Sequence, residues 1–135
     1  MEKFSCVIIE DDPIFVEIMK NFITQTDLLE LVGEADDSIS AAMLISKLKP
    51  VVIFTDVMIP GLTGLEILEF LNYRPTIIVI SGLEDIEQEV YKHPYVSHYV
   101  KKPITPQSFH TVLKKLSIEL TGVPLKNSSR LPFSN

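Results

Sequence analysis

The chain has 135 residues, 46% hydrophobic and 22% charged, which is enough for one compact domain with a hydrophobic core and too few for two. Its net charge of −6 argues against a basic surface for nucleic acid. A single cysteine, Cys6, excludes an intrachain disulfide, and no apolar run approaches the roughly 20 residues of a membrane helix. We therefore expect one cytoplasmic domain that binds neither nucleic acid nor membrane directly.

Five short apolar runs, rich in Val, Ile and aromatic residues and bounded by acidic, Pro or Gly residues, predict five β-strands. In chain order they are Phe4–Ile9, Leu28–Val32, Val51–Phe54, Thr76–Ile80 and Val96–Val100. Because these runs are apolar on both faces, they are typical of a parallel sheet covered by helices on either side.

Apolar residues between the strands recur at helical spacing and predict helices. The stripes are Phe15, Ile18, Met19 and Phe22; Ala42, Leu44, Ile45 and Leu48; Leu65, Leu68 and Leu71; and Phe109, Val112, Leu113 and Leu116. A short acidic helix over Glu84–Tyr91 completes the pattern, and Asp12 with Pro13 predicts the N-cap and first residue of the first helix. Alternating strands and helices predict a doubly wound α/β fold with a five-stranded parallel sheet.

The composition changes after Leu120, where the sequence reads TGVPLKNSSRLPFSN and shows no helical stripe. We predict a folded domain over residues 1–120 and a flexible tail or the start of a linker over residues 121–135.

Polar residues follow four of the five strands, at the strand ends where doubly wound folds bind ligands. They are Glu10, Asp11 and Asp12 after the first strand, Asp56 after the third, Ser81 and Gly82 after the fourth, and Lys101, Lys102 and Pro103 after the fifth. In the common strand order 2-1-3-4-5 the first and third strands are adjacent, so Glu10, Asp11 and Asp56 converge. Crowded carboxylates repel one another, and Mg²⁺ relieves that repulsion.

The remaining strand-end residues suit phosphoryl transfer to an oxygen nucleophile. Lys102 offers a positive charge and Ser81 a hydroxyl on the far side of an anion that sits against the metal ion. Asp56 is the candidate nucleophile, because aspartyl phosphates are known covalent intermediates.

Four separated motifs, VIIEDDP, FTDVMIPGLTG, IIVISG and YVKKPI, resemble the strand-end motifs of bacterial response regulator receiver domains, in the same order over about residues 4 to 120. The resemblance implies the flavodoxin-like receiver fold. It also implies that Asp56 accepts a phosphoryl group from the phosphohistidine of a sensor histidine kinase or a phosphotransfer protein. Glu10, Asp11 and the backbone carbonyl of Met58 would then hold Mg²⁺.

The resemblance also assigns the switch residues. Ser81 would contact the phosphoryl group, Lys102 would form its ion pair, and Tyr99 resembles the rotating switch aromatic. Neighbouring strand residues point to opposite faces, so only one of Lys101 and Lys102 can reach the site. The Lys102–Pro103 bond resembles a cis-peptide position, and phosphorylation-dependent pairing of two copies is a family expectation.

Two further expectations concern the surroundings of the site. Ile14 and Val16 flank the first helical stripe and offer apolar surface for a kinase helical bundle, or else pack under a neighbouring loop. Met58 and Leu83 are apolar where polar residues could orient a hydrolytic water, so we expect the phosphoryl group to be lost slowly. HPYVSHYV stands where receivers usually carry a Gly-Ala pair, which is a departure from the family.

Three functions stay open at this point. The first is a phosphoacceptor switch, which catalyses only its own phosphorylation and dephosphorylation and is no enzyme for an external metabolite. The second is a receiver-like module that works by protein contact alone, and the third is a Mg²⁺-dependent phosphatase, which would want a carboxylate in place of Met58. MIPGLTGLEIL, with the short loop before PTIIVIS, resembles receivers joined to LytTR-type DNA-binding domains.

Overall fold

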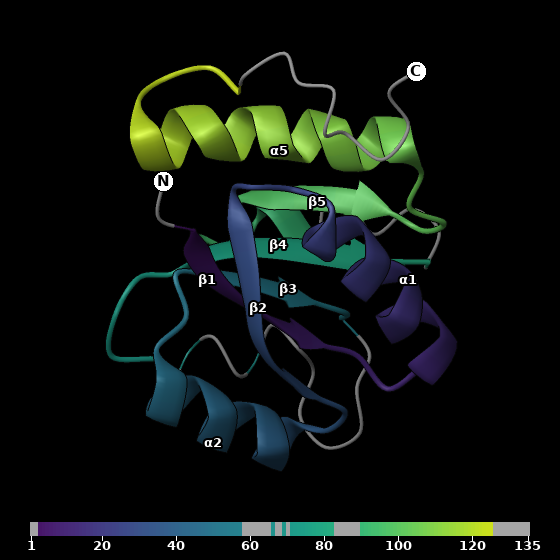
Figure 1. Cartoon of the computed structure of the whole chain (residues 1–135). Helices are drawn as coiled ribbons and strands as arrows, with labels where there is room; N and C mark the ends of the chain where they lie inside the picture. Colours follow the sequence, from purple (N-terminus) through teal and green to yellow (C-terminus); the bar gives the residue numbers. More distant parts are fainter. Residues whose placement is uncertain (1–2, 58–65, 67–68, 70, 83–89, 126–135) are drawn as a thin grey trace.

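A five-stranded parallel sheet forms the centre of the protein in the computed structural model, which describes residues 3–57, 66, 69, 71–82 and 90–125 (Figure 1). The strands are β1 (Phe4–Ile9), β2 (Leu29–Ala35), β3 (Val52–Thr55), β4 (Thr76–Ser81) and β5 (His98–Lys101). Their order is β2-β1-β3-β4-β5, and all neighbouring strands are parallel. The predicted strand order is confirmed, with β1 and β3 adjacent where the winding reverses.

Helices cover both faces of this sheet (Figure 1). They are α1 (Pro13–Thr24), α2 (Ser38–Leu48) and α5 (Pro106–Thr121), with α1 and α5 on one face and α2 on the other. The helices predicted over Leu65–Leu71 and Glu84–Tyr91 fall mostly outside the described residues. Within the described part of the chain, no helix is both long and apolar enough to cross a membrane.

The apolar strands fill two cores because successive side chains point to opposite faces. On the α1/α5 face, Cys6 and Ile8 of β1 belong to the same core as Phe54 of β3 and Phe109 of α5. The centroids of the Phe54 and Phe109 rings lie 6.4 Å apart. On the other face, residues of β1, β3 and β4 pack against α2. The final helical stripe is confirmed, since all four of its predicted residues are buried.

The ends of the helices on the α1/α5 face are fixed by local hydrogen bonds. Asp12 caps α1 as predicted: its Oδ1 accepts a hydrogen bond of 3.0 Å from the Ile14 N–H, and Pro13 is the first helical residue. Gly122 caps the end of α5 in the left-handed region, at φ 77°. The helix therefore extends one residue beyond the predicted domain boundary at residue 120.

Two helical stripes differ from prediction at their edges. In α1, Val16 is buried and Ile18 is 41% exposed, although the sequence suggested the reverse. In α2 the buried residues include Ala41 and Ile45, whereas Ala42 and Leu48 are exposed. A period of 3.6 residues locates an apolar face but not its borders, which depend on how the helix is rotated against the sheet.

The edge strands also differ from prediction. β2 continues to Ala35 and carries a bulge, since Cys6 pairs with Leu31 and Val7 with Gly33. The predicted strand ends at Val32 because Gly33 and the exposed Glu34 interrupt the apolar run, although β2 continues past them. β5 begins two residues later than predicted, because the Val96 N–H bonds back to the His93 carbonyl in a turn.

The lone thiol provides a test of the packing of β1. Cys6 is fully buried, and burial raises its pKa from 9.0 to about 12. We expect a thiol reagent such as DTNB to react with the folded protein at neutral pH only as fast as the chain unfolds, since the thiolate is the reactive form. In denaturant the single thiol should react rapidly and completely. Rapid reaction without denaturant would contradict the burial of β1.

Candidate functional site

Three carboxylates meet at the carboxyl ends of β1 and β3. Glu10 and Asp11 follow β1, Asp56 follows β3, and one ligand oxygen from each lies within 4.8 Å of the others. The backbone bonds of the sheet fix two of these residues, because the Glu10 N–H donates to the Ala35 carbonyl and the Asp56 N–H to the Ile9 carbonyl, both at 2.9 Å. The structure thus brings together the three acidic residues that the strand order predicted would converge.

Lys102 places its ammonium group between two of these carboxylates. Its Nζ lies 2.5 Å from Glu10 Oε1 and 2.9 Å from Asp56 Oδ2. The Lys102 N–H donates to the Ser81 carbonyl at 2.9 Å, so the residue continues the pairing of β5 with β4. The Lys102–Pro103 peptide is cis, as expected, and the Lys101 side chain is exposed.

Burial and neighbouring charges shift the pKa values of two ionisable groups of the site. Burial raises the pKa of Glu10 above its ordinary value, while the hydrogen bonds from Lys102 and the Asp12 N–H oppose the rise. For Lys102, burial acts to lower the pKa, but its hydrogen bonds to Glu10 and Asp56 outweigh that effect and raise it. Lys102 therefore stays cationic at neutral pH, and three carboxylates against one ammonium leave an excess of negative charge.

The donor atoms of the site fit Mg²⁺. All three ligand candidates are carboxylate oxygens, which hard divalent cations prefer. Glu10 is 3% exposed, whereas Asp11 is exposed, so the cluster opens toward solvent on one side. Mg²⁺ keeps several waters and binds to few protein groups, which suits such an open site. The fourth predicted ligand, the carbonyl of Met58, lies outside the described residues, as does Leu83.

The two predicted switch residues lie on neighbouring strands. Ser81 ends β4 and is fully buried, while Tyr99 of β5 is half-buried and pairs in register with Val79. The Tyr99 N–H donates to the Tyr91 Oη at 3.1 Å, and the two rings meet edge to face with centroids 6.4 Å apart. The switch role of Tyr99 remains a prediction.

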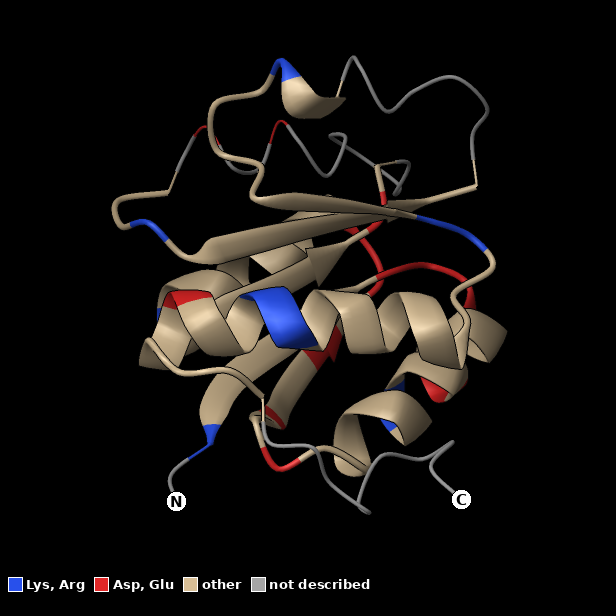
Figure 2. Cartoon of the chain, turned by 90° about the horizontal axis from the view of Figure 1, so that it is seen from above, with Lys and Arg blue, Asp and Glu red and all other residues tan. Residues whose placement is uncertain are grey.

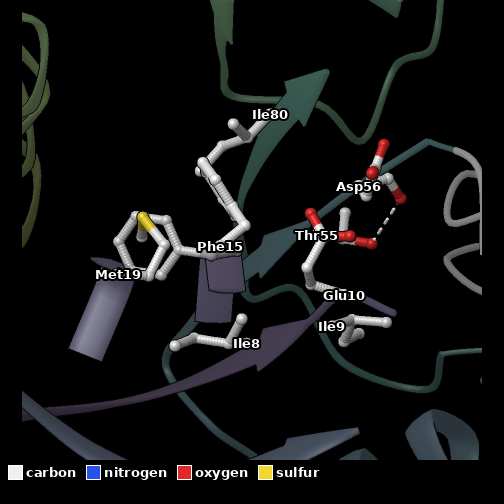
Figure 3. Close-up of a pocket in the computed structure, with 9 residues that line it drawn as sticks. Ile8, Ile9, Glu10, Phe15, Met19, Thr55, Asp56 and Ile80 are labelled. Atoms are coloured by element: carbon white, nitrogen blue, oxygen red, sulfur yellow. Dashed lines mark hydrogen bonds between the residues drawn. The ribbon is translucent and has the colours of Figure 1, made fainter. Parts of the chain in front are cut away.

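Sequence reasoning missed one side chain at this site. Phe15, interpreted only as a core residue, lies with its ring centroid 4.4 Å from the Lys102 Nζ. It lines a shallow hollow beside the carboxylates, shown in Figure 3 with Met19 and Ile80 on one side and Glu10 and Asp56 on the other. Spacing along the chain gives no signal for this contact, because it joins α1 to the residue after β5.

Charge is distributed unevenly at this end of the sheet. Figure 2 shows acidic segments at the strand ends beside the basic segment that follows β5.

On the surface of α1 next to the site, Ile14 is 73% exposed. Of the two residues predicted to offer apolar surface, Ile14 is therefore exposed, whereas Val16 is buried in the core.

Most of the chain is similar to known proteins. The family model described as response regulator receiver domain matches residues 6–114. The transcriptional regulatory protein BtsR of Salmonella typhi is 28% identical over 115 residues, which cover 84% of this chain and 48% of BtsR. An uncharacterized response regulatory protein of Vibrio vulnificus is 24% identical over 115 residues, 84% of this chain and 47% of that protein. The chain spans about half the length of these curated relatives.

Solved structures share the fold. The response regulator domain of Thermotoga maritima CheB has a TM-score of 0.77 and 23% identity, covering 92% of this chain and 100% of that one. The response regulatory domain of mrkE from Klebsiella pneumoniae has a TM-score of 0.76 and 24% identity, covering 85% and 96%. At such identities the likeness shows the fold alone.

Proposed function

Because the chain belongs to the response regulator receiver domain family, which acts in two-component systems, we propose that it is a phosphorylation switch. Asp56 accepts a phosphoryl group from the phosphohistidine of a sensor histidine kinase in a Mg²⁺-dependent reaction. The observation that carries this proposal is the position of the Lys102 ammonium, which touches both Glu10 and Asp56 at an acidic strand-end cluster. A cation and converging carboxylates at one point suit the transfer of an anionic group.

Each described residue has a proposed task in this reaction. An Asp56 carboxylate oxygen forms the new bond to phosphorus as the bond to the donor's imidazole nitrogen breaks. Lys102 holds positive charge against the transferred group. Glu10 and Asp11 hold Mg²⁺, together with the Met58 carbonyl in our proposal, and the bound ion supplies further positive charge. The Ser81 hydroxyl contacts the phosphoryl group.

The switching step is proposed to start from the same contacts. Once Asp56 carries a phosphoryl group, its contact with Lys102 must change, and Lys102 is bonded through its backbone to Ser81. Ser81 and Tyr99 lie on adjacent strands, so a shift of one is passed to the ring of the other and to Tyr91 beside it. The domain catalyses its own phosphorylation and dephosphorylation and turns over no metabolite.

The proposed kinase contact lies on α1. Ile14 and Ile18 are 73% and 41% exposed on the helix that begins beside the acidic cluster. This apolar surface suits a helical phosphodonor, and in it Ile18 replaces Val16, the residue predicted from the sequence. Pairing of two phosphorylated copies remains an additional proposal.

The domain is proposed to work within a longer regulator. Its curated relatives are about twice as long as the matched region, and BtsR is named a transcriptional regulatory protein. Regulation of transcription, through a LytTR-type or other DNA-binding domain, would then be the output.

The experiment that tests the function uses beryllofluoride, which mimics a phosphoryl group. Fluorine NMR of the protein with Mg²⁺ and beryllofluoride should show a bound signal that disappears on chelation of Mg²⁺. The Asp56→Ala variant should show no bound signal. If the wild-type protein shows none either, the contact-only module becomes the better explanation, whereas release of phosphate from many phosphate esters would favour a phosphatase.

A further inference from the structure

We propose that Phe15 is a positioning residue whose ring holds the Lys102 ammonium toward Asp56. This inference rests on the proposed function, because it concerns the geometry of phosphoryl transfer. The Lys102 Nζ lies 4.4 Å from the centroid of the Phe15 ring, within the range of a cation–π interaction. The ring is 8% exposed and the lysine side chain 21% exposed, so water competes only weakly for the ammonium.

The structure fixes the position of this ring. Phe15 lies in the first turn of α1, three residues after the Asp12 N-cap, and Pro13 restricts the backbone between them. Met19, one turn later, is fully buried and lines the same hollow. The ring is therefore presented by a capped helix and not by a mobile loop.

A neutral ring suits this position better than a further carboxylate. The ammonium already contacts Glu10 and Asp56, and a third anion would repel an incoming phosphoryl group. The ring attracts the cation through its negative face without adding net charge. Its attraction also persists when Asp56 is phosphorylated, whereas the contact between Lys102 and the free carboxylate changes.

Removal of the Phe15 ring should leave the Lys102 ammonium less firmly held in its position next to Asp56. A lysine side chain has many rotamers, and each lost contact allows more of them. We expect the rate of phosphorylation by acetyl phosphate to fall about fivefold when the cation–π attraction is removed. Phe15→Leu keeps an apolar side chain there, and a Phe15→Tyr variant should retain most of the rate.

A fluorination series tests the role of the ring at nearly constant shape. Phenylalanine with increasing numbers of fluorine atoms, introduced at position 15, has a progressively weaker negative face. The phosphorylation rate should fall in steps along the series. The matched control is the same series at Phe22, which lies on the same helix but packs against the Phe109 ring at 5.0 Å between centroids. That series should leave the rate unchanged.

A second readout does not depend on activity. In the metal-free protein, the ring current of Phe15 should shift the ε-methylene protons of Lys102 upfield in the NMR spectrum, and Phe15→Leu should abolish the shift. A rate that is unchanged across the Phe15 series, or Lys102 protons unaffected by Phe15→Leu, would overturn the inference. If the wild-type protein accepts no phosphoryl group, the proposed function fails. The upfield shift of the Lys102 ε-methylene protons then decides by itself whether the Phe15 ring holds the ammonium.

Discussion

Replacement of Lys102 with Met lowers the free energy of unfolding by about 2–3 kcal/mol in metal-free buffer at neutral pH, whereas Lys101→Met changes it by less than about 0.5 kcal/mol. Glu10 is 3% exposed and loses a charge partner that lies 2.5 Å away. Methionine preserves the length and apolar stem of the side chain, so the loss reflects charge more than packing. Lys101 is exposed, and its replacement serves as the matched control.

The stability difference should depend on pH in a defined direction. The pKa of Glu10 is raised above its ordinary value of 4.5, with burial as the main cause. A raised carboxyl pKa means that this group favours the folded state most when it is protonated, below about its ordinary pKa, and that this contribution is lost as pH rises through the folded-state pKa. Because the hydrogen bond from Lys102 holds this pKa down, Lys102→Met should raise it further. The deficit of Lys102→Met should therefore be small in acid, where Glu10 is protonated in both proteins, and grow as the pH increases to neutrality.

Urea unfolding followed by circular dichroism measures both effects. Saturating Mg²⁺ should narrow the gap between Lys102→Met and the wild-type protein, since a cation that binds the folded state stabilises it and offsets the missing ammonium. The phosphorylation rate of Lys102→Met should nevertheless stay about 100-fold below that of the wild type. Equal stability and equal rates for the Lys101 and Lys102 variants would contradict the proposed role of Lys102.

Replacement of Asp11 with Asn is expected to weaken Mg²⁺ binding at least about tenfold, whereas Asp12→Asn leaves it nearly unchanged. Asp11 offers a carboxylate oxygen to the acidic cluster. Asp12 directs its carboxylate to the Ile14 N–H, where Asn caps equally well. The two variants remove the same charge from adjacent residues, so any difference between them reflects the position of the side chain.

Isothermal titration calorimetry, or the rise in melting temperature with added Mg²⁺, measures this affinity. Asp56→Asn should also weaken binding, because it removes another carboxylate of the same cluster. Equal loss of affinity in the Asp11 and Asp12 variants would show that Mg²⁺ responds to the general charge of the surface and not to these ligands.

Much of the site follows from the sequence because strand ends are fixed by topology. Once β1 and β3 are known to be adjacent and parallel, the residues after them must share an edge of the sheet. The buried strands β1, β3 and β4 coincide with continuous apolar runs, which predict them. The edge strand β2 is longer than its apolar run predicts, because Gly33 and the exposed Glu34 interrupt that run, and charged side chains are typical of an exposed sheet edge.

What the sequence could not predict depends on how elements pack against one another. In α1, Val16 is buried and Ile18 is exposed, contrary to prediction, because burial at the border of the apolar stripe depends on how the helix is rotated against the sheet. The approach of Phe15 to Lys102 joins two elements distant in sequence, and an aromatic residue in an apolar stripe is by itself a core residue. Only the three-dimensional arrangement shows that the face of the Phe15 ring lies against the Lys102 ammonium.

The proposed function requires that a carboxylate oxygen of Asp56 forms the new bond to phosphorus. The most direct measurement is mass spectrometry of the protein after reaction with acetyl phosphate and Mg²⁺, with borohydride reduction to mark the acyl phosphate. We expect the mass of one added phosphoryl group before reduction and homoserine in place of Asp56 after it, because reduction releases the phosphate. Neither product should appear when Mg²⁺ is chelated. A phosphoryl group mapped to another residue, or none in the wild-type protein under these conditions, would contradict the proposed function.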